Sequence, residues 1–170
     1  TPHPNHLDPT LEAMAAGAHV IVEKPLASTL EDCDVMIAAG KKYNKKLGTI
    51  SQRRFYEPVI RLKKAIDDGK IGRPILGTIN MLSWRDEKYY KSDPWRGSWE
   101  HEGGGVMVNQ APHQLDLLIW LMGEIDEVYG TWANMTHPYI EVEDTALAIV
   151  KFKNGGLGSI FLSNCQKPGI

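Results

Sequence analysis

The sequence predicts an α/β unit over residues 1–53 followed by an α+β unit over residues 54–170. Up to residue 53, helical and strand patterns alternate, which is typical of a doubly wound parallel layer. After that point a few helices are followed by long antiparallel strands, and Asn154-Gly155 between the last two strands is a strong hairpin signal. A chain of 170 residues can bury the core of one or two such domains.

In the first unit we expect a helix, a strand, a helix and a strand, at residues 9–16, 19–22, 29–43 and 47–51. Asp8 is a candidate N-cap of the first helix, and Gly17 ends it. The strand at 19–22 is apolar without alternation, as buried parallel strands often are. Ser28 or Thr29 can cap the second helix, because acidic residues follow in its first turn.

In the second unit we expect two helices and four strands, at residues 58–68, 75–84, 112–122, 127–135, 145–153 and 157–163. Gly69 and Gly123 end the two helices. Residues 85–105 show no clear period and contain two tyrosines, two tryptophans and several glycines. A stretch of that length without a regular pattern is usually functional, so we expect it to contribute to a site.

Composition excludes several classes of protein. The net charge is −2, whereas a nucleic-acid-binding surface usually needs an excess of clustered basic residues. Cys33 and Cys165 are too few to define a disulfide framework or a metal site, and a reduced cytoplasmic location is the expectation. No apolar run approaches the ~20 residues of a membrane span, and no signal peptide is visible. His3 and His6 lack further ligands nearby in sequence, so we predict no metal site.

Lys24 is the first candidate for chemistry. It follows the apolar strand at 19–22, and open α/β sheets bind ligands at the carboxyl ends of their parallel strands. Pro25 stiffens the backbone after it and disfavours the helical conformation for Lys24, and the bond between them is a candidate cis peptide. An ammonium held this way can stabilise a developing alkoxide or relay a proton. The alternative is a solvated lysine at a strand-to-loop junction.

His113 is the second candidate. It lies in the first turn of an apolar helix, where the positive end of the helix dipole favours the neutral imidazole that accepts protons. Such a base can take the proton from a secondary alcohol. Asn109 can position a substrate hydroxyl, and Asp116 can orient the His113 ring. The alternatives are a histidine capping the helix start, a loop asparagine bonded to its own backbone, and a surface carboxylate.

The aromatic stretch in residues 85–105 can line a pocket for a flat ring or a sugar face. Its candidates are Tyr89, Tyr90, Trp95 and Trp99, and Arg96 can bind a phosphate or carboxylate as a fork. The alternative is ordinary packing under a long loop.

Several collinear motifs resemble the glucose–fructose oxidoreductase/inositol dehydrogenase-like (Gfo/Idh/MocA) family over essentially the whole chain. The motifs are Thr1-Pro2-His3-Pro4-Asn5-His6, Ala16-Gly17-Ala18-His19-Val20, Glu23-Lys24-Pro25-Leu26-Ala27, Arg54-Phe55-Tyr56-Glu57-Pro58, Gly69-Lys70-Ile71-Gly72, Gly103-Gly104-Gly105 with His113 and Asp116-Leu117, and Glu143-Asp144-Thr145-Ala146. The resemblance implies the carboxyl-terminal part of a Rossmann-type nucleotide-binding domain, then an incomplete substrate and oligomerisation domain with an open, mainly antiparallel sheet.

The resemblance also implies an NAD- or NADP-dependent oxidoreductase that transfers hydride between nicotinamide and a secondary alcohol or ketone of a sugar, nucleotide-sugar or polyol. A homo-oligomer formed through the open sheet is implied as well. The residues implied in catalysis are Lys24, His113 and Asn109. Those implied in cofactor binding are Thr1, Pro2, His6, Glu23, Lys24, Pro25, Trp95 and Arg96. Those implied in substrate binding are Lys24, Tyr90, Arg96, Asn109 and His113.

Two departures from the family pattern bear on this expectation. Many members carry Asp where this chain has Asn109, which disfavours an inositol substrate and leaves His113 as the proton carrier with Lys24 in support. The glycine-rich phosphate loop is not in the sequence, and the opening Thr1-Pro2 reads like a loop entered from a strand, so we expect a fragment. The alternative function is a non-catalytic sugar- or protein-binding relative that has lost dinucleotide binding.

Overall fold

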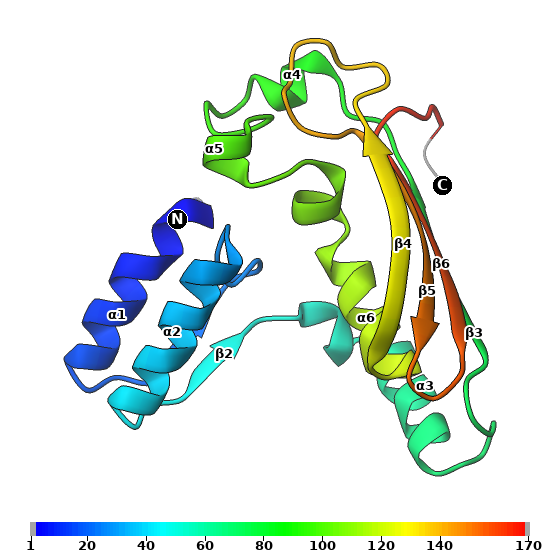
Figure 1. Ribbon diagram of the computed structural model, residues 1–170, viewed down its shortest axis with the longest axis horizontal. Helices are drawn as coiled ribbons and strands as arrows, with labels where there is room; N and C mark the ends of the chain where they lie inside the picture. The colour runs from blue at the N-terminus through cyan, green and yellow to red at the C-terminus, as the bar shows by residue number, and fades with distance from the viewer. Residues whose placement is uncertain (1–2, 169–170) are drawn as a thin grey trace.

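The computed structural model describes residues 3–168 and consists of two lobes. Figure 1 shows a small lobe with the N-terminus on one side and a larger lobe built on a curved sheet on the other. The chain passes between them once, in the segment after strand β2. The expected fold class, an α/β layer followed by a mainly antiparallel sheet, is confirmed.

The first lobe alternates helices and strands: η1 (His3–His6), α1 (Leu7–Ala15), β1 (Val20–Val22), α2 (Leu30–Lys42) and β2 (Leu47–Thr49). β1 and β2 pair in parallel, as expected for a doubly wound layer. The Thr29 side chain caps α2 by accepting a hydrogen bond from the Asp32 N–H at 3.1 Å. Met14 and Met36 are completely buried where α1 and α2 pack together.

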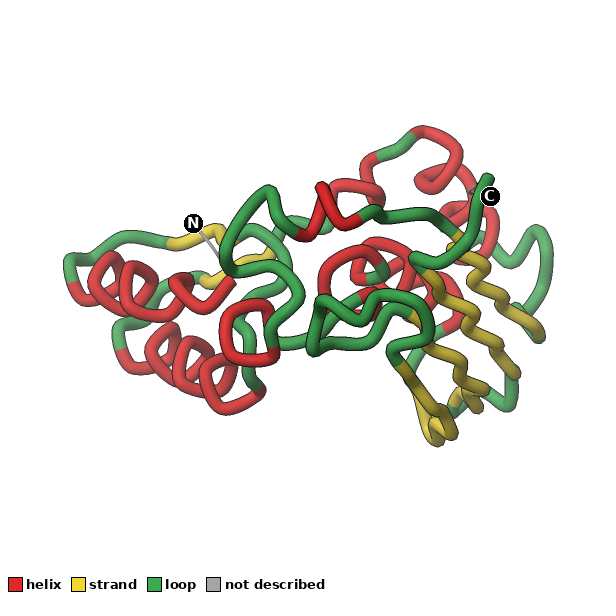
Figure 2. The backbone as a smooth tube through the Cα atoms, turned by 90° about the horizontal axis from the view of Figure 1, so that it is seen from above, coloured by secondary structure: helices red, strands yellow, loops and turns green. Residues whose placement is uncertain are grey.

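The second lobe contains η2 (Gln52–Phe55), α3 (Glu57–Asp67), β3 (Leu76–Leu82), α4 (Glu87–Tyr90), α5 (Trp99–Glu102), the π-helix η3 (Val106–Gln110), α6 (Pro112–Met122), β4 (Ile125–Ala133), β5 (Thr145–Phe152) and β6 (Leu157–Ser163). The strand order is β3-β6-β5-β4. β3 runs parallel to β6, and the other two pairings are antiparallel. Figure 2 shows the four strands side by side, with the helices of the first lobe at the opposite end of the molecule.

The core of the second lobe lies between α6 and one face of the sheet. Its members are apolar residues from alternate positions of the strands and from the inner side of α6: Ile79, Leu118, Met122, Ala146, Val150, Phe152, Ile160 and Leu162. α6 approaches β3 closely at Gly77, where a Cβ atom would lie 2.7 Å from Leu118 Cδ1. The absence of a side chain at this position therefore permits the helix to pack against the sheet.

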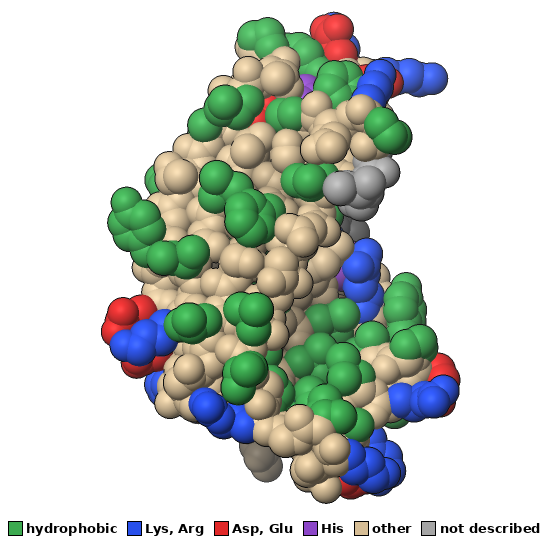
Figure 3. Space-filling model, turned by 90° about the vertical axis from the view of Figure 1, so that its right-hand side faces the viewer, with side chains coloured by type: hydrophobic (Ala, Val, Ile, Leu, Met, Phe, Trp, Pro, Cys, Tyr) green, Lys and Arg blue, Asp and Glu red, His purple; other side chains and the backbone are tan. Residues whose placement is uncertain are grey.

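The other face of the sheet is exposed. Strand pairing places six large hydrophobic residues on this outer face, each at least 42% exposed: Leu76, Tyr129, Leu147, Ile149, Leu157 and Phe161. Figure 3 shows hydrophobic side chains distributed over this face, with charged groups toward its margins. We refer to these six residues as the outer sheet face.

The structure differs from the sequence prediction mainly in residues 85–105. Two one-turn helices, α4 and α5, lie where no pattern was detected, and each begins with a side-chain cap, from Asp86 and Ser98 respectively. Helices this short show too little periodicity to be recognised in sequence. Within residues 3–168, no helix combines the length and apolar character needed to cross a membrane.

Candidate active site

A cleft of about 400 Å³ lies where the first lobe meets the second. Its walls come from the end of β1, from β3 and the segment after it, and from the π-helix and the start of α6. The lining residues are Lys24, Arg53, Met81, Ser83, Arg85, Tyr89, Asn109, Gln110, His113 and Gln114. The structure therefore brings the three predicted catalytic residues to one cleft, although they come from two lobes.

Lys24 lies two residues past the end of β1, and the Lys24–Pro25 peptide bond is cis. Its ammonium Nζ donates a hydrogen bond to the main-chain carbonyl of Asn109 at 2.8 Å, which joins the two lobes across the cleft. Burial lowers the pKa of Lys24, and the nearby carboxylates of Glu23 and Glu102 oppose this shift. The alternative of a fully solvated lysine is therefore not what the structure shows.

The triple-glycine segment is held by a single buried carboxylate. Glu143 accepts hydrogen bonds from the N–H groups of Gly105 at 2.8 Å and Met107 at 3.0 Å, and its main-chain carbonyl accepts from Val106 at 3.0 Å. A Cβ atom at Gly105 would lie 1.8 Å from the Glu143 carbonyl oxygen. This close approach is possible only for glycine, and it fixes the start of the π-helix that carries Asn109.

His113 is half-buried in the first turn of α6. Burial lowers its pKa, and the positive charges of Lys24 and Arg53 lower it further. The imidazole is therefore neutral at pH 7 and can accept a proton. The helix dipole predicts the same direction of the His113 pKa shift, but in the structure the shift arises from burial and neighbouring cations.

Asp116 does not orient His113. Its two carboxylate oxygens accept from Arg54, with Nε at 2.8 Å and Nη2 at 2.5 Å. This bidentate pair ties η2 to α6 and raises the pKa of Arg54, chiefly through the hydrogen bond. The expectation that Asp116 supports the imidazole is thus wrong, because a guanidinium 62 residues away occupies both oxygens.

The side-chain amide of Asn109 contacts Glu102, which was not among the predicted site residues, and Tyr89 of the predicted aromatic stretch. Its Nδ2 donates to Glu102 Oε1 and to the Tyr89 hydroxyl, the latter at 3.3 Å. Glu102 is 1% exposed, and burial raises its pKa despite hydrogen bonds from Gly97 and Asn109. A buried carboxylate cannot be recognised from sequence here, because Glu102 lies in a short helix without periodicity.

Arg96 and Trp95 lie beside the cleft. The Arg96 guanidinium stacks on the rings of Tyr89 and Trp95, at 4.5 and 4.4 Å from their centroids. It also donates to the Tyr89 hydroxyl at 2.7 Å and to Asp93 at 3.0 Å. Arg96 contributes to the lowered pKa of Lys24, so its charge lies within range of the site.

Tyr90, predicted to bind substrate, is buried at 6% exposure and does not line the cleft. Its hydroxyl accepts a hydrogen bond from Asn164 at 3.1 Å, and burial raises its pKa. The neighbouring Tyr89 lines the cleft instead. In the turn of α4, adjacent residues point in different directions, so sequence alone could not decide which tyrosine faces the site.

Of the residues predicted to bind cofactor, His6, Glu23, Lys24 and Pro25 lie in the first lobe, whereas Trp95 and Arg96 lie in the second. His6 is buried and its Nδ1 lies 3.0 Å from the Pro25 carbonyl oxygen, which fixes the loop carrying Lys24. His6 and Glu23 also line a hollow of about 270 Å³ that runs along β1. Thr1 and Pro2, predicted for the same role, lie outside the described residues.

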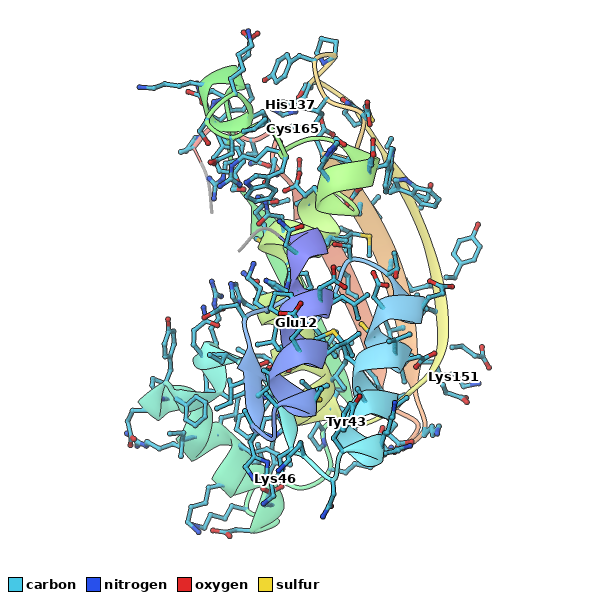
Figure 4. The ribbon with its side chains drawn as sticks, turned by 90° about the vertical axis from the view of Figure 1, so that its left-hand side faces the viewer. Glu12, Tyr43, Lys46, His137, Lys151 and Cys165 are labelled. Atoms are coloured by element: carbon cyan, nitrogen blue, oxygen red, sulfur yellow. The ribbon has the colours of Figure 1, made fainter. Side chains whose placement is uncertain are left out.

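A second polar cluster lies beyond the cleft, at the end of the sheet. One ring nitrogen of His137, one carboxylate oxygen of Asp144 and the Sγ atom of Cys165 lie within 4.8 Å of one another. Figure 4 shows His137 and Cys165 side by side. His137 sits between Asp144 at 2.6 Å and the Arg85 carbonyl at 2.7 Å. Burial alone would raise the pKa of Asp144, but hydrogen bonds from His137 and two backbone N–H groups lower it. These bonds position Arg85 at the cleft.

Comparison with known proteins agrees with this architecture. Residues 1–50 match a family model described as an oxidoreductase family with an NAD-binding Rossmann fold, and residues 59–169 match the GFO/IDH/MocA C-terminal domain. The chain is 34% identical over 169 residues to 1-carboxy-3-chloro-3,4-dihydroxycyclohexa-1,5-diene dehydrogenase of Comamonas testosteroni, covering 96% of this chain and 40% of the relative. It is 32% identical to myo-inositol 2-dehydrogenase of Thermotoga maritima, with 91% and 45% covered.

Solved structures give the same result. The WlbA dehydrogenase of Bordetella pertussis, solved with NADH and UDP-GlcNAcA, superposes with a TM-score of 0.93 at 37% identity, covering 99% of this chain and 51% of that one. Levoglucosan dehydrogenase with NADH and levoglucosan superposes with a TM-score of 0.90 at 28% identity, covering 99% and 47%. The chain thus spans about half the length of the relatives that it matches.

Proposed function

The chain belongs to the Gfo/Idh/MocA oxidoreductase family, and from this premise we propose that the intact protein is an NAD- or NADP-dependent dehydrogenase or reductase. It interconverts a secondary alcohol and a ketone on a sugar, nucleotide-sugar or polyol. The observation that carries the proposal is the single cleft shared by Lys24, Asn109 and His113.

The residues present are compatible with a nicotinamide cofactor. β1 and β2 are parallel, and Lys24, which lies just past the carboxyl end of β1, lines the cleft. The hollow lined by His6 and Glu23 runs along β1. His6, Glu23 and Lys24, with Trp95 and Arg96 from the second lobe, are the described residues proposed to contact it. When bound, the nicotinamide accepts or supplies the hydride of the reaction.

The side chains of the cleft supply the proton chemistry. In the oxidation direction, His113 accepts the hydroxyl proton, because burial and adjacent cations keep its imidazole neutral. The Lys24 ammonium, fixed by the Asn109 carbonyl, stabilises negative charge that develops on the substrate oxygen. In the reduction direction, the same imidazole returns the proton to the oxygen.

The charge of the cleft favours an anionic substrate. Its charged lining residues are Lys24, Arg53 and Arg85, and no carboxylate lines it. Within residues 3–168, neither arginine forms an ion pair. Guanidinium groups that lack a carboxylate partner bind carboxylates and phosphates well, so a uronate or a nucleotide-sugar fits better than a neutral polyol.

The test is a turnover assay of the intact protein with NAD and NADP against UDP-GlcNAcA, levoglucosan and myo-inositol. We expect turnover of the anionic sugar, and a His113→Ala variant about 10²–10⁴-fold slower, the usual contribution of acid–base catalysis. Sugar binding without any binding of NADH or NADPH would replace the enzyme proposal with that of a non-catalytic binding relative.

We further propose that the intact protein forms a homo-oligomer through the outer sheet face. Six large hydrophobic side chains exposed together are unusual on a monomer and typical of an interface. An Ile149→Asp variant, compared with wild type by analytical ultracentrifugation, should dissociate. An unchanged sedimentation coefficient would exclude this face as the interface.

A further inference from the structure

Asn109 presents the oxygen of its side-chain amide to the cleft. A side-chain amide has two N–H hydrogens on its nitrogen and lone pairs on its oxygen. The nitrogen of Asn109 faces Glu102 Oε1, which accepts one of its hydrogens, and lies 3.3 Å from the Tyr89 hydroxyl oxygen. Among residues 5–168, no donor forms a hydrogen bond with the amide oxygen, and Asn109 lines the cleft, so that oxygen remains for a ligand.

Glu102 fixes this orientation of the amide. It is 1% exposed, and its second oxygen, Oε2, accepts from the Gly97 N–H at 2.6 Å. A carboxylate only accepts, so a flipped amide would place the Asn109 oxygen against Glu102 Oε1 and leave a buried charge without its donor. That arrangement is costly in a buried site. The orientation is therefore set from outside the cleft, seven residues earlier in the chain.

The Tyr89 hydroxyl contributes little to this orientation. Its oxygen accepts from Arg96 Nη1 at 2.7 Å and Gln110 Nε2 at 2.8 Å. These two donors fill the two lone pairs of the hydroxyl oxygen, so the longer contact from Asn109 Nδ2 at 3.3 Å is weak, and Glu102 is the group that sets the orientation.

We propose that Glu102 is a positioning residue that orients the Asn109 amide, so that this part of the cleft accepts a hydrogen bond from a substrate hydroxyl. The statement about substrate rests on the proposed function, whereas the orientation of the amide does not. The amide oxygen at this position accepts the hydroxyl hydrogen close to Lys24, whose ammonium donates to the Asn109 main-chain carbonyl at 2.8 Å.

The orientation can be measured without a ligand by NMR of the ¹⁵N-labelled intact protein. The Asn109 side-chain NH₂ signal is assigned by its loss in an Asn109→Asp variant. We expect the hydrogen bonded to Glu102 to be protected from exchange in the wild type and deprotected in Glu102→Gln, whose amide can donate to a flipped Asn109. Glu100→Gln, in the same helix but exposed, is the matched control and should leave the signal unchanged. Unchanged protection in Glu102→Gln would overturn the proposal.

The role of Glu102 in substrate binding is tested by exchanging the carboxylate and the amide between positions 102 and 109. Glu102→Gln should raise KM about tenfold with a smaller change in kcat, for whichever of UDP-GlcNAcA, levoglucosan and myo-inositol is turned over. In the double variant Glu102→Gln/Asn109→Asp, the new amide donates to the new carboxylate, which again presents an oxygen to the cleft. KM should return to within about threefold of wild type.

A residue that only supports the fold would not be rescued in this way. A double variant with a KM as high as the single variant would therefore overturn the assignment of the acceptor site. If none of the three compounds is turned over by the wild type, the proposed function fails, and the NMR experiment still decides whether Glu102 orients the amide.

Discussion

Replacing Gly105 by alanine tests the contact on which the site geometry depends. The new Cβ atom would lie 1.8 Å from the Glu143 carbonyl oxygen and 2.9 Å from its carbonyl carbon. Both are backbone atoms next to strand β5, and neither can rotate away. The two segments must therefore separate, and the hydrogen bonds between them are lost.

The expected loss of stability follows from those bonds. The bond from the Gly105 N–H to the Glu143 carboxylate at 2.8 Å is charge-assisted and contributes about 1.5–3 kcal/mol. The bond from the Val106 N–H to the Glu143 carbonyl at 3.0 Å contributes about 0.5–1.5 kcal/mol. The variant should lose about 2–4.5 kcal/mol, and Tm should fall by roughly 4–18 °C for a protein of this size.

The assay is thermal and urea unfolding followed by circular dichroism, with Gly48→Ala as the control. Gly48 lies in strand β2, and a Cβ atom there would meet no heavy atom within 4 Å. The control should stay within about 0.5 kcal/mol of wild type. If Gly105→Ala is as stable as the control, the close approach of the glycine segment to Glu143 does not exist, and the position deduced for Asn109 loses its support.

Four further predictions concern other features of the structure. Because the pKa of His113 is lowered below 6.5, the acidic limb of the kcat/KM profile of the intact enzyme should lie below pH 6.5. As pH falls below 6.5, the His113 imidazole takes up a proton more readily in the unfolded chain than in the folded one, so the free energy of unfolding should decline. His113→Gln should reduce that decline. A double-mutant cycle with Arg54→Met and Asp116→Asn, measured by urea unfolding, should give a coupling of about 1 kcal/mol, reduced by partial exposure; no coupling would exclude the bidentate pair. Thr29→Ala should cost about 1 kcal/mol through loss of the α2 cap, and thermal unfolding that matches wild type would contradict that role.

The sequence predicted those parts of the fold that depend on local patterns. The strand at Val20–Val22, the cap at Thr29 and the hairpin at Asn154-Gly155 all follow from periodicity and turn chemistry within a few residues. The placement of Lys24 was also predictable, because a residue that follows a buried parallel strand lies at the ligand-binding edge of the sheet.

The parts that could not be predicted depend on contacts between distant residues. Asp116 is three positions from His113, yet it pairs with Arg54 because η2 packs beside α6 in the folded chain. Glu143 reaches the glycine segment across 38 residues. Neither contact leaves a local signal, since an isolated carboxylate in a sequence has the same appearance whether it is buried or solvated.

The parallel pairing of β3 with β6 has a consequence for biosynthesis. β3 ends at residue 82 and its partner begins at residue 157, so the ribosome must add about 75 residues before β3 can acquire its neighbour. At ~5–20 residues per second, this takes roughly 4–15 s, during which the apolar strand and the helix that packs on it await the rest of their sheet. The nascent polypeptide is then open to chaperones, and a pause in translation after β5 would extend that exposure.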